Sequence, residues 1–282
     1  MGLTYFTDWM ESGNALRLEL YEASYAALAY HRANTMPFSR LFAVRRRIGG
    51  PEARIGNLHT GKVMTMAPDH LYLLNSRLPI QFHFEPETEF FAFHFNLTLR
   101  GNYDLFLTTD VFAEYEDAGF VRAMSRIFFD EPFGVAGACR MKALLLDAIA
   151  RFIPADVPDF QGTQYFYYGK LLSYIQFEAD ASTSMQTLSA LTPFSADTLS
   201  RRFSADFGVP LKSYLNQTLA MRACLLIGEH RYRIREIARM LGFHNEYYFS
   251  RFFRKLTGMT PTQYRNQAGQ SQAGSFLRNS RP

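Results

Sequence analysis

The sequence is poor in cysteine and contains no long apolar run. Its two cysteines, Cys139 and Cys224, lie far apart, each in an apolar stretch with helical spacing. We expect buried free thiols in a reducing cytosol rather than a disulfide or a metal site. No stretch of about eighteen apolar residues is present, so we expect no membrane-spanning helix. Residues 1–8 lack a basic segment followed by an apolar one, so we expect a cytoplasmic protein without a secretory signal.

Charge is distributed unevenly along the chain. Residues 1–164 hold 15 Lys and Arg against 19 Asp and Glu, whereas residues 165–266 hold 13 against 7. A basic C-terminal segment behind an acidic N-terminal one is typical of a polyanion-binding module attached to another domain. The charge asymmetry alone is weak evidence for nucleic-acid binding, because a charged surface usually contacts only solvent.

Two kinds of periodicity divide the chain. Short strands, aromatic or β-branched in part, are predicted at 38–48, 61–66, 71–74, 80–85 and 90–95. Their spacing favours an antiparallel barrel or jelly roll. Helical spacing follows at 118–129 and 140–152. Residues 153–159 contain two prolines and are predicted to be a linker, beyond which the chain is helical up to a Gln- and Ser-rich tail.

An internal repeat is present in the C-terminal part. Leu-Ser-Arg-Arg-Phe at 199–203 is matched by Phe-Ser-Arg-Phe-Phe at 249–253, and Gly208 is matched by Gly258 at the same offset of fifty. Upstream, residues 188–189 match 237–238 at an offset of forty-nine, so we place a one-residue difference in a turn. Such a repeat is one supersecondary unit used twice.

Each copy is predicted to be a helix, a tight turn and a second helix. In the second copy, Gly242 stands where a helix end needs a left-handed residue, and Asn245 is a good N-cap for the next helix. Thr260 and Gln263 have the spacing of a capping box. The side chains of the second helix that are predicted to point inward are those of Tyr248, Phe249, Phe252 and Phe253. Its outward residues would be Glu246, Tyr247, Ser250, Arg251 and Arg254, a set that fits a DNA major groove.

The segment IARMLGFHNEYYFSRFFRK at 237–255, with Gly258, Pro261, Tyr264 and Arg265 after it, resembles the AraC/XylS family of bacterial transcription regulators. The resemblance covers residues 165–266. It implies two helix-turn-helix units joined by a linker helix at 211–229, with the recognition helices in successive major grooves of double-stranded DNA. The candidate DNA-binding residues are Asp197, Ser200, Arg201, Glu246, Tyr247, Ser250, Arg251 and Arg254.

The first copy departs from the family pattern. Ser189 stands where the family usually has Ala, Pro193 where it often has Gly, and Leu219 where the linker helix commonly has Arg. These departures leave the fold expectation intact and weaken the details of the first recognition helix. In the second copy, Tyr247 either contacts DNA or packs on Arg251, and the sequence leaves both readings open.

For the N-terminal half, the resemblance implies a sensor and dimerisation domain. The expected fold class is α+β, with a cupin-like antiparallel barrel and two helices before an all-α domain with two helix-turn-helix units. Its expected divisions are 1–160, 161–268 and a disordered tail at 269–282. The helix at 140–152 is expected to form a homodimer through its apolar face. Candidate ligand residues are Phe82, His83, Phe93 and His94, with the barrel-lining face left open.

Three other functions are alternatives to an effector-responsive DNA-binding regulator. A metal enzyme of the cupin type is disfavoured, because His59, His70, His83 and His94 lack the His-x-His spacing of such barrels, and we expect no catalytic residue, metal or cofactor. A repair transferase of related architecture would need four cysteines for zinc. A constitutive DNA-binding protein whose barrel only dimerises stays open. Family habit implies an activator of a metabolic operon that contacts RNA polymerase and responds to a sugar or other small polar effector.

Overall fold

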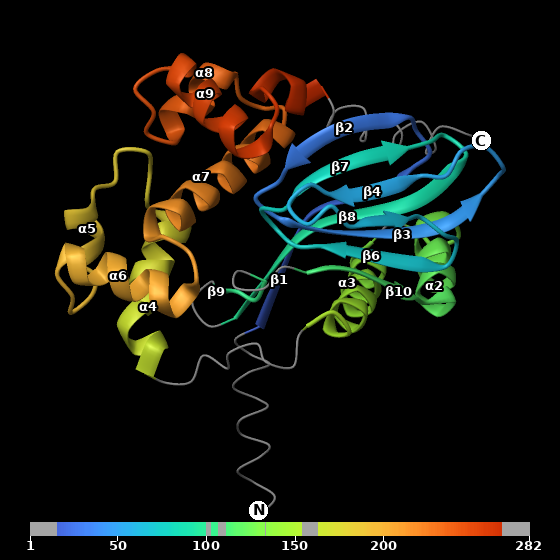
Figure 1. Ribbon diagram of the computed structural model, residues 1–282, viewed down its shortest axis with the longest axis horizontal. Helices are drawn as coiled ribbons and strands as arrows, with labels where there is room; N and C mark the ends of the chain where they lie inside the picture. Colours follow the sequence, from blue (N-terminus) through green and yellow to red (C-terminus); the bar gives the residue numbers. More distant parts are fainter. Residues whose placement is uncertain (1–15, 100–102, 107–110, 133, 154–162, 267–282) are drawn as a thin grey trace, which may run out of the picture.

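The computed structural model describes residues 16–99, 103–106, 111–132, 134–153 and 163–266. Within these ranges the N-terminal half is built from two antiparallel sheets, and the C-terminal half is helical (Figure 1). The expected tail at 269–282, the expected domain boundary at residue 160 and most of the expected linker lie outside the described residues. No helix in the described part of the chain is both long and apolar enough to cross a membrane.

The two sheets contain six and four strands. The larger sheet has the order β1-β8-β3-β6-β10, with β9 paired to β8, and the smaller has the order β2-β7-β4-β5. The larger sheet comprises β1 (Leu16–Ala26), β3 (Ser39–Arg47), β6 (His70–Leu74), β8 (Thr88–Leu99), β9 (Tyr103–Asp104) and β10 (Phe112–Glu116). The smaller comprises β2 (Tyr30–Thr35), β4 (Arg54–Asn57), β5 (Val63–Thr65) and β7 (Pro79–Phe84). The expected α+β class with an antiparallel N-terminal half is confirmed, and the barrel is not closed, because among the described residues no strand pairing joins the two sheets.

The alternation of side chains along β8 creates two cores. Phe90 and Ala92 face the smaller sheet and join an apolar cluster with Phe82 and Phe84 of β7. The intervening phenylalanines, such as Phe93, face the other way into a second cluster. Because side chains on a strand point to opposite faces in turn, one strand serves both cores.

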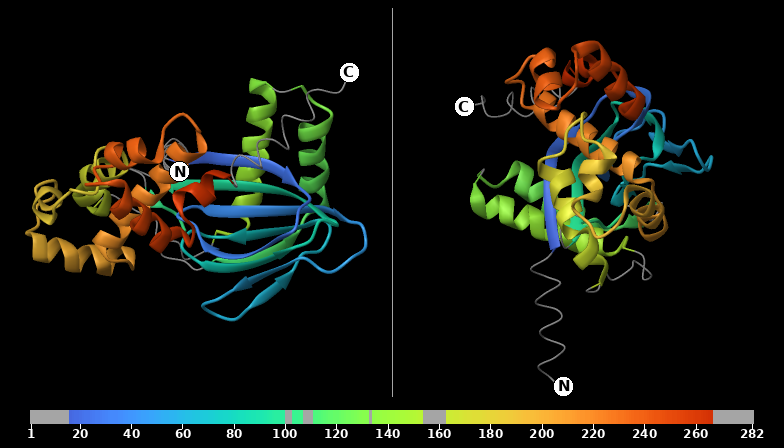
Figure 2. Two further views of the ribbon diagram at one scale, coloured as in Figure 1. Left: turned by 90° about the horizontal axis from the view of Figure 1, so that it is seen from above. Right: turned by 90° about the vertical axis from the view of Figure 1, so that its left-hand side faces the viewer.

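Two helices cover the outer face of the larger sheet (Figures 1 and 2). They are α2 (Ala118–Phe129) and α3 (Val135–Ala150), and the bounds of α2 agree with those expected. Leu145, Ala148 and Ile149 of α3 are completely buried in the core beneath the sheet. The apolar face expected to form a dimer is therefore used within the chain, and the expected contact through Ile149 is wrong. Cys139, expected to be buried, is exposed on α3.

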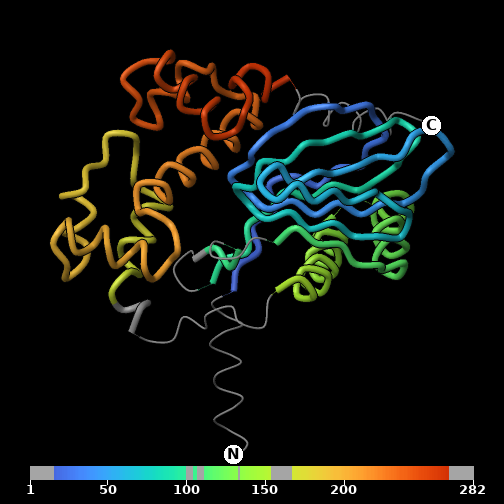
Figure 3. The backbone as a smooth tube through the Cα atoms, viewed as in Figure 1, coloured from blue at the N-terminus to red at the C-terminus, as the bar shows by residue number. Residues whose placement is uncertain are grey.

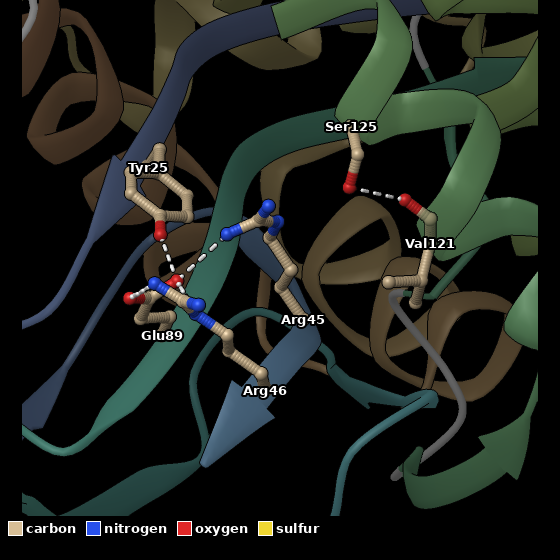
Figure 4. Close-up of polar contacts among 6 residues, drawn as sticks. All are labelled: Tyr25, Arg45, Arg46, Glu89, Val121 and Ser125. Atoms are coloured by element: carbon tan, nitrogen blue, oxygen red, sulfur yellow. Dashed lines mark hydrogen bonds and ion pairs between the residues drawn. The ribbon is translucent and has the colours of Figure 1, made fainter. Parts of the chain in front are cut away.

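Glu89 connects three strands beside these helices (Figure 4). Its carboxylate accepts hydrogen bonds from Arg46 Nε and Nη2, both at 2.7 Å, from Arg45 Nη1 at 2.9 Å, and from the Tyr25 hydroxyl. The Arg45 guanidinium also lies 5.0 Å from the ring centroid of Phe129 on α2. The charged cluster thus holds β1, β3 and β8 together and fixes the end of α2 against them.

The C-terminal half consists of helices joined by short turns. They are α4 (Thr163–Phe177), α5 (Met185–Ser189), α6 (Ala196–Phe207), α7 (Leu211–Gly228), α8 (Ile234–Met240) and α9 (Glu246–Thr257), followed by a helical turn at 261–266. The tube in Figure 3 shows α7 running between the pair α5–α6 and the pair α8–α9. The expected linker helix is confirmed, and Cys224 within it is buried as expected.

Candidate nucleic-acid interface and cavity

The second helix-turn-helix unit is formed by α8, a five-residue turn and α9. Gly242 in the turn has a φ of +73°, and Gly258 ends α9 with a φ of +77°. Asn245 accepts a hydrogen bond from the Tyr248 backbone nitrogen at 3.0 Å and so caps α9. The expected turn and caps are confirmed. The expected capping box is confirmed too, because Thr260 and Gln263 exchange hydrogen bonds of 2.9 and 3.2 Å.

The outward face of α9 is largely free of internal packing. Glu246, Tyr247, Arg251 and Arg254 are exposed, and Ser250 is half-buried. Phe249 and Phe253 are completely buried on the opposite face. Tyr248 was expected to point inward, but its residue is 55% exposed, because it begins the helix beyond the edge of the core. It therefore joins the side chains available to a partner.

Tyr247 and Arg251 are in contact on this face. The Arg251 guanidinium lies 5.8 Å from the Tyr247 ring centroid, one helical turn along α9. Tyr247 is nevertheless 65% exposed. The ring therefore packs on the arginine and still presents an edge outward, so the two readings left open by the sequence do not exclude each other.

The first unit, α5 with α6, repeats this arrangement. Ser195 caps α6 by accepting from the Thr198 backbone nitrogen at 3.4 Å, and Gly208 ends the helix with a φ of +66°. Its turn contains six residues where that of the second unit contains five. The expected placement of the one-residue difference in a turn is therefore wrong, because the second copy is the longer one in sequence and its additional residue lies in α8. The three candidate residues of α6 are all exposed: Asp197, Ser200 and Arg201.

Further basic side chains near the second unit were not singled out from the sequence. Arg233 precedes α8, and Arg235 and Arg239 lie on it, all exposed. Their only sequence signal was the excess of basic residues in this part of the chain. Exposed arginines beside a recognition helix are suited to phosphate contacts, which position a protein on DNA without reading its sequence.

A cavity of about 640 Å³ opens between the two sheets. Phe82 and His94 line it, as do Gln263 and Asn266 from the helical turn after α9. Of the other two candidate ligand residues, His83 is exposed on the far side of β7. Phe93 is buried on the opposite face of β8, with its ring 6.3 Å from that of Phe120 on α2. The structure therefore brings together only one residue from each candidate pair.

His94 is fixed at the cavity wall by two neighbours. Its Nδ1 lies 2.9 Å from a carboxylate oxygen of Glu22, and its ring stacks on Phe38 at 4.9 Å between centroids. Nowhere in the described ranges do three His, Cys, Asp or Glu side chains gather closely enough to hold a metal ion.

The second unit lies near β2 (Figure 1), and residues of β2 line the cavity. Met36 and Phe38 belong to the same buried cluster as Phe249 and Phe253 of α9. A Cβ at Gly258 would lie 3.5 Å from the Cα of Asn34 on β2. The end of the second recognition helix is therefore in van der Waals contact with a strand that borders the cavity.

Comparison with known proteins agrees with this architecture. Residues 188–267 match the family model of a helix-turn-helix domain. The HTH-type transcriptional activator RhaR of Salmonella dublin is 30% identical over 102 residues, or 36% of each chain. RhaR of Salmonella arizonae is 37% identical over 73 residues, or 26% of each chain. The chain thus matches about a third of these curated relatives' length, and the matched residues contain a helix-turn-helix domain.

Solved structures extend the likeness to the whole fold. A single-substitution variant of apo ToxT from Vibrio cholerae aligns with a TM-score of 0.62 at 10% identity, covering 90% of this chain and 98% of ToxT. A second ToxT structure aligns with a TM-score of 0.60 at 11% identity. At this identity the likeness shows the fold alone. The alignment extends over both halves of the chain.

Proposed function

We propose that this chain is a sequence-specific DNA-binding regulator of transcription whose activity responds to a small molecule. The observation that carries the proposal is the paired construction of α6 and α9. Each helix buries aromatic side chains on its inner face and exposes an arginine six residues after its N-cap, Arg201 in one and Arg251 in the other. Such a helix can enter a major groove and donate twice to a guanine.

The remaining candidate residues have complementary roles in this proposal. Ser200, Tyr247 and Ser250 would contact base edges or phosphates beside the arginines, and Asp197 and Glu246 would accept from cytosine amino groups. Arg254, nearly a turn beyond Arg251, would contact phosphate. The RhaR relatives are named transcriptional activators, which supports activation as the mode of regulation.

The cavity supports the response to an effector. Two of the ToxT structures hold ToxT bound to an unsaturated fatty acid and to (E)-4-(8-methylnaphthalen-1-yl)but-3-enoic acid. Here, residues Gln263 and Asn266 of the DNA-binding half line the cavity together with strands of the other half. An occupant would therefore touch both halves at once and bias how the second unit sits.

We also propose a non-enzymatic, cytoplasmic regulator that acts as a homodimer and contacts RNA polymerase. The surface proposed for the dimer is the outward face of α3, where Val135 is 82% exposed. Light scattering at about tens of micromolar tests the dimer. If the protein stays monomeric there, that part of the proposal is wrong.

Gel shifts with the full chain and the DNA upstream of its own gene test the proposed function. We expect binding that resists an excess of unrelated DNA and weakens steeply with salt. Binding that is equal for specific and unrelated DNA would contradict sequence-specific regulation.

A further inference from the structure

Arg40 is a buried cation in the wall of the cavity. It lies on β3, is only 2% exposed, and lines the space between the sheets. Its Nη1 donates to Asn34 Oδ1 at 2.7 Å. Its Nε and Nη2 are buried, and neither has a hydrogen-bond partner among the described residues. A buried guanidinium with two unpaired donor groups is costly to maintain, so its position calls for an explanation.

No carboxylate compensates this charge among the described residues. Glu22, the acidic side chain that lines the cavity, pairs with His94 on the neighbouring strand β8. Burial lowers the pKa of Arg40 to about 10, so the side chain remains charged near neutral pH. The cavity wall therefore carries a positive charge that no described residue neutralises.

The unpaired groups have the geometry of an anion site. Nε and Nη2 lie along one edge of the planar guanidinium, and a carboxylate binds that edge with two parallel hydrogen bonds. Asn34 occupies the remaining nitrogen and fixes the plane. The Phe82 ring lies 5.2 Å below the guanidinium carbon and restricts it further.

One side of the cavity is suited to an apolar body. Phe42, Phe84 and Phe90 line it together with Phe82 and Met36. Its volume of about 640 Å³ falls in the range of about 300–1,000 Å³ that small-molecule sites occupy. Polar side chains such as Ser24, His31 and Gln263 line other parts of the cavity, so we assign the apolar body to the side where the phenylalanine rings lie.

We propose that the cavity binds a monocarboxylic acid with an apolar body, with its carboxylate on Nε and Nη2 of Arg40 and its body among the phenylalanine rings. This names the effector class of the proposed function and rests on that function only for its regulatory consequence. A dianion such as a phosphate monoester is disfavoured, because Glu22 lines the same cavity and would repel the second charge.

The site is connected to the second helix-turn-helix unit through one residue. Asn34 holds Arg40, and its Cα is the atom nearest to where a Cβ of Gly258 would lie. A ligand that moves Arg40 therefore acts on β2 directly below the C-terminal end of α9. Acid binding is expected to change DNA affinity in the same protein, in a direction that gel shifts report.

The test compares acids with their neutral amides by calorimetry on the full chain. The probes are 4-phenylbutyrate and octanoate against 4-phenylbutanamide and octanamide. We expect each acid to bind at least about tenfold more tightly than its amide, because only the acid can pair with the guanidinium. Arg40→Met should abolish this preference. Arg32→Met is the matched control, since Arg32 lines the same cavity but is exposed, and the preference should persist.

The proposal is overturned if neither acid binds at about 1 mM, if acid and amide bind equally, or if Arg40→Met keeps the preference. Should Arg40→Met fail to fold by circular dichroism, the comparison of acid with amide on the wild type decides alone. Gel shifts without ligand separate the two proposals. Acid binding without specific DNA binding would overturn only the proposed function, and DNA binding without an acid preference would overturn only the carboxylate site.

Discussion

Gly242 lies directly against the carboxylate of Asp180, and this contact joins the turn of the second helix-turn-helix unit to the segment that leads into the first. A Cβ at residue 242 would stand 2.5 Å from Asp180 Oδ2. The carboxylate is held in place, because Oδ1 accepts from the backbone nitrogen of Ser182 at 2.8 Å and from its hydroxyl at 2.7 Å. The backbone nitrogen of Ala181 also donates to Leu241 O at 2.9 Å. Space and backbone conformation thus both require glycine here.

We expect Gly242→Ala to destabilise the protein by about 2–5 kcal/mol. The left-handed backbone costs a non-glycine residue about 1–2 kcal/mol, and the overlap with Asp180 adds about 1–3 kcal/mol. Denaturant unfolding of the full chain measures the loss. Gly61→Ala is the matched control, because Gly61 has the same φ of +73° with nothing within 4 Å of its added Cβ. Equal losses in the two variants would show that the contact with Asp180 does not matter.

Arg251→Ala is expected to relax sequence preference in one half of the binding site, and Arg201→Ala in the other. Loss of a bidentate contact to guanine removes about 1–3 kcal/mol of discrimination, or about fivefold to over a hundredfold. Selection of binding sites by each variant and by the wild type measures the change. A uniform loss of affinity with an unchanged selected motif would mean that Arg251 contacts phosphate or only supports Tyr247.

Arg254→Ala serves as the contrast. A phosphate contact carries no sequence information, so its loss should weaken binding to all sequences alike and reduce the slope of log K against log salt by about one. Titrations at several salt concentrations measure the slope. A changed base preference with an unchanged slope would assign Arg254 to base contacts instead.

Glu89→Gln should remove a pH-dependent part of the stability. Hydrogen bonds from Arg46, Tyr25 and Arg45 lower the pKa of Glu89 from 4.5 to about 2. Because the folded-state pKa is depressed, the stabilisation of about 2–3 kcal/mol is present above about pH 5 and is lost as the pH falls through 4.5 toward 2. Unfolding curves should show the wild type and the variant converging over that interval.

Glu52→Gln provides the control for this experiment. Glu52 pairs with Arg47 and Arg54 at 3.5 and 3.4 Å, but the pair is exposed to solvent. Exposed pairs contribute about 0–1 kcal/mol, so this variant should lie close to the wild type at every pH. If the two variants behave alike, the Glu89 cluster adds no more than a surface ion pair does.

The elements that could be predicted from the sequence are those whose apolar residues all pack against one neighbouring core. Helix α2 agrees at both ends, because Asp117 caps it and its apolar face packs on one sheet. Strands β1 and β2 were missed for different reasons. In β1, Leu16, Leu18 and Leu20 do alternate with polar residues, so the signal existed. In β2, the segment YHRANT has no apolar alternation, since three of its six residues are exposed in succession.

The candidate DNA-binding residues could be predicted from the sequence, because both the internal repeat and the family resemblance indicated them. The residues that line the cavity could not. Arg40 follows Ser39 at the start of a strand, where a charged residue is ordinarily at a surface. Its burial depends on β2 and β7 crossing over it, and no local pattern encodes that packing. Likewise, the apolar face of α3 was read as an interface, because the sequence does not state how much of a helix the sheet will cover.

The shared cluster of Met36 and Phe38 with α9 has a consequence for how the protein can be divided. Cutting the chain before α4 would expose to water the apolar surface of the second helix-turn-helix unit on which those two side chains pack. A fragment bearing such a surface tends to self-associate, and this would mimic cooperative DNA binding in a gel. Each half of the chain thus covers apolar surface of the other and keeps it from water.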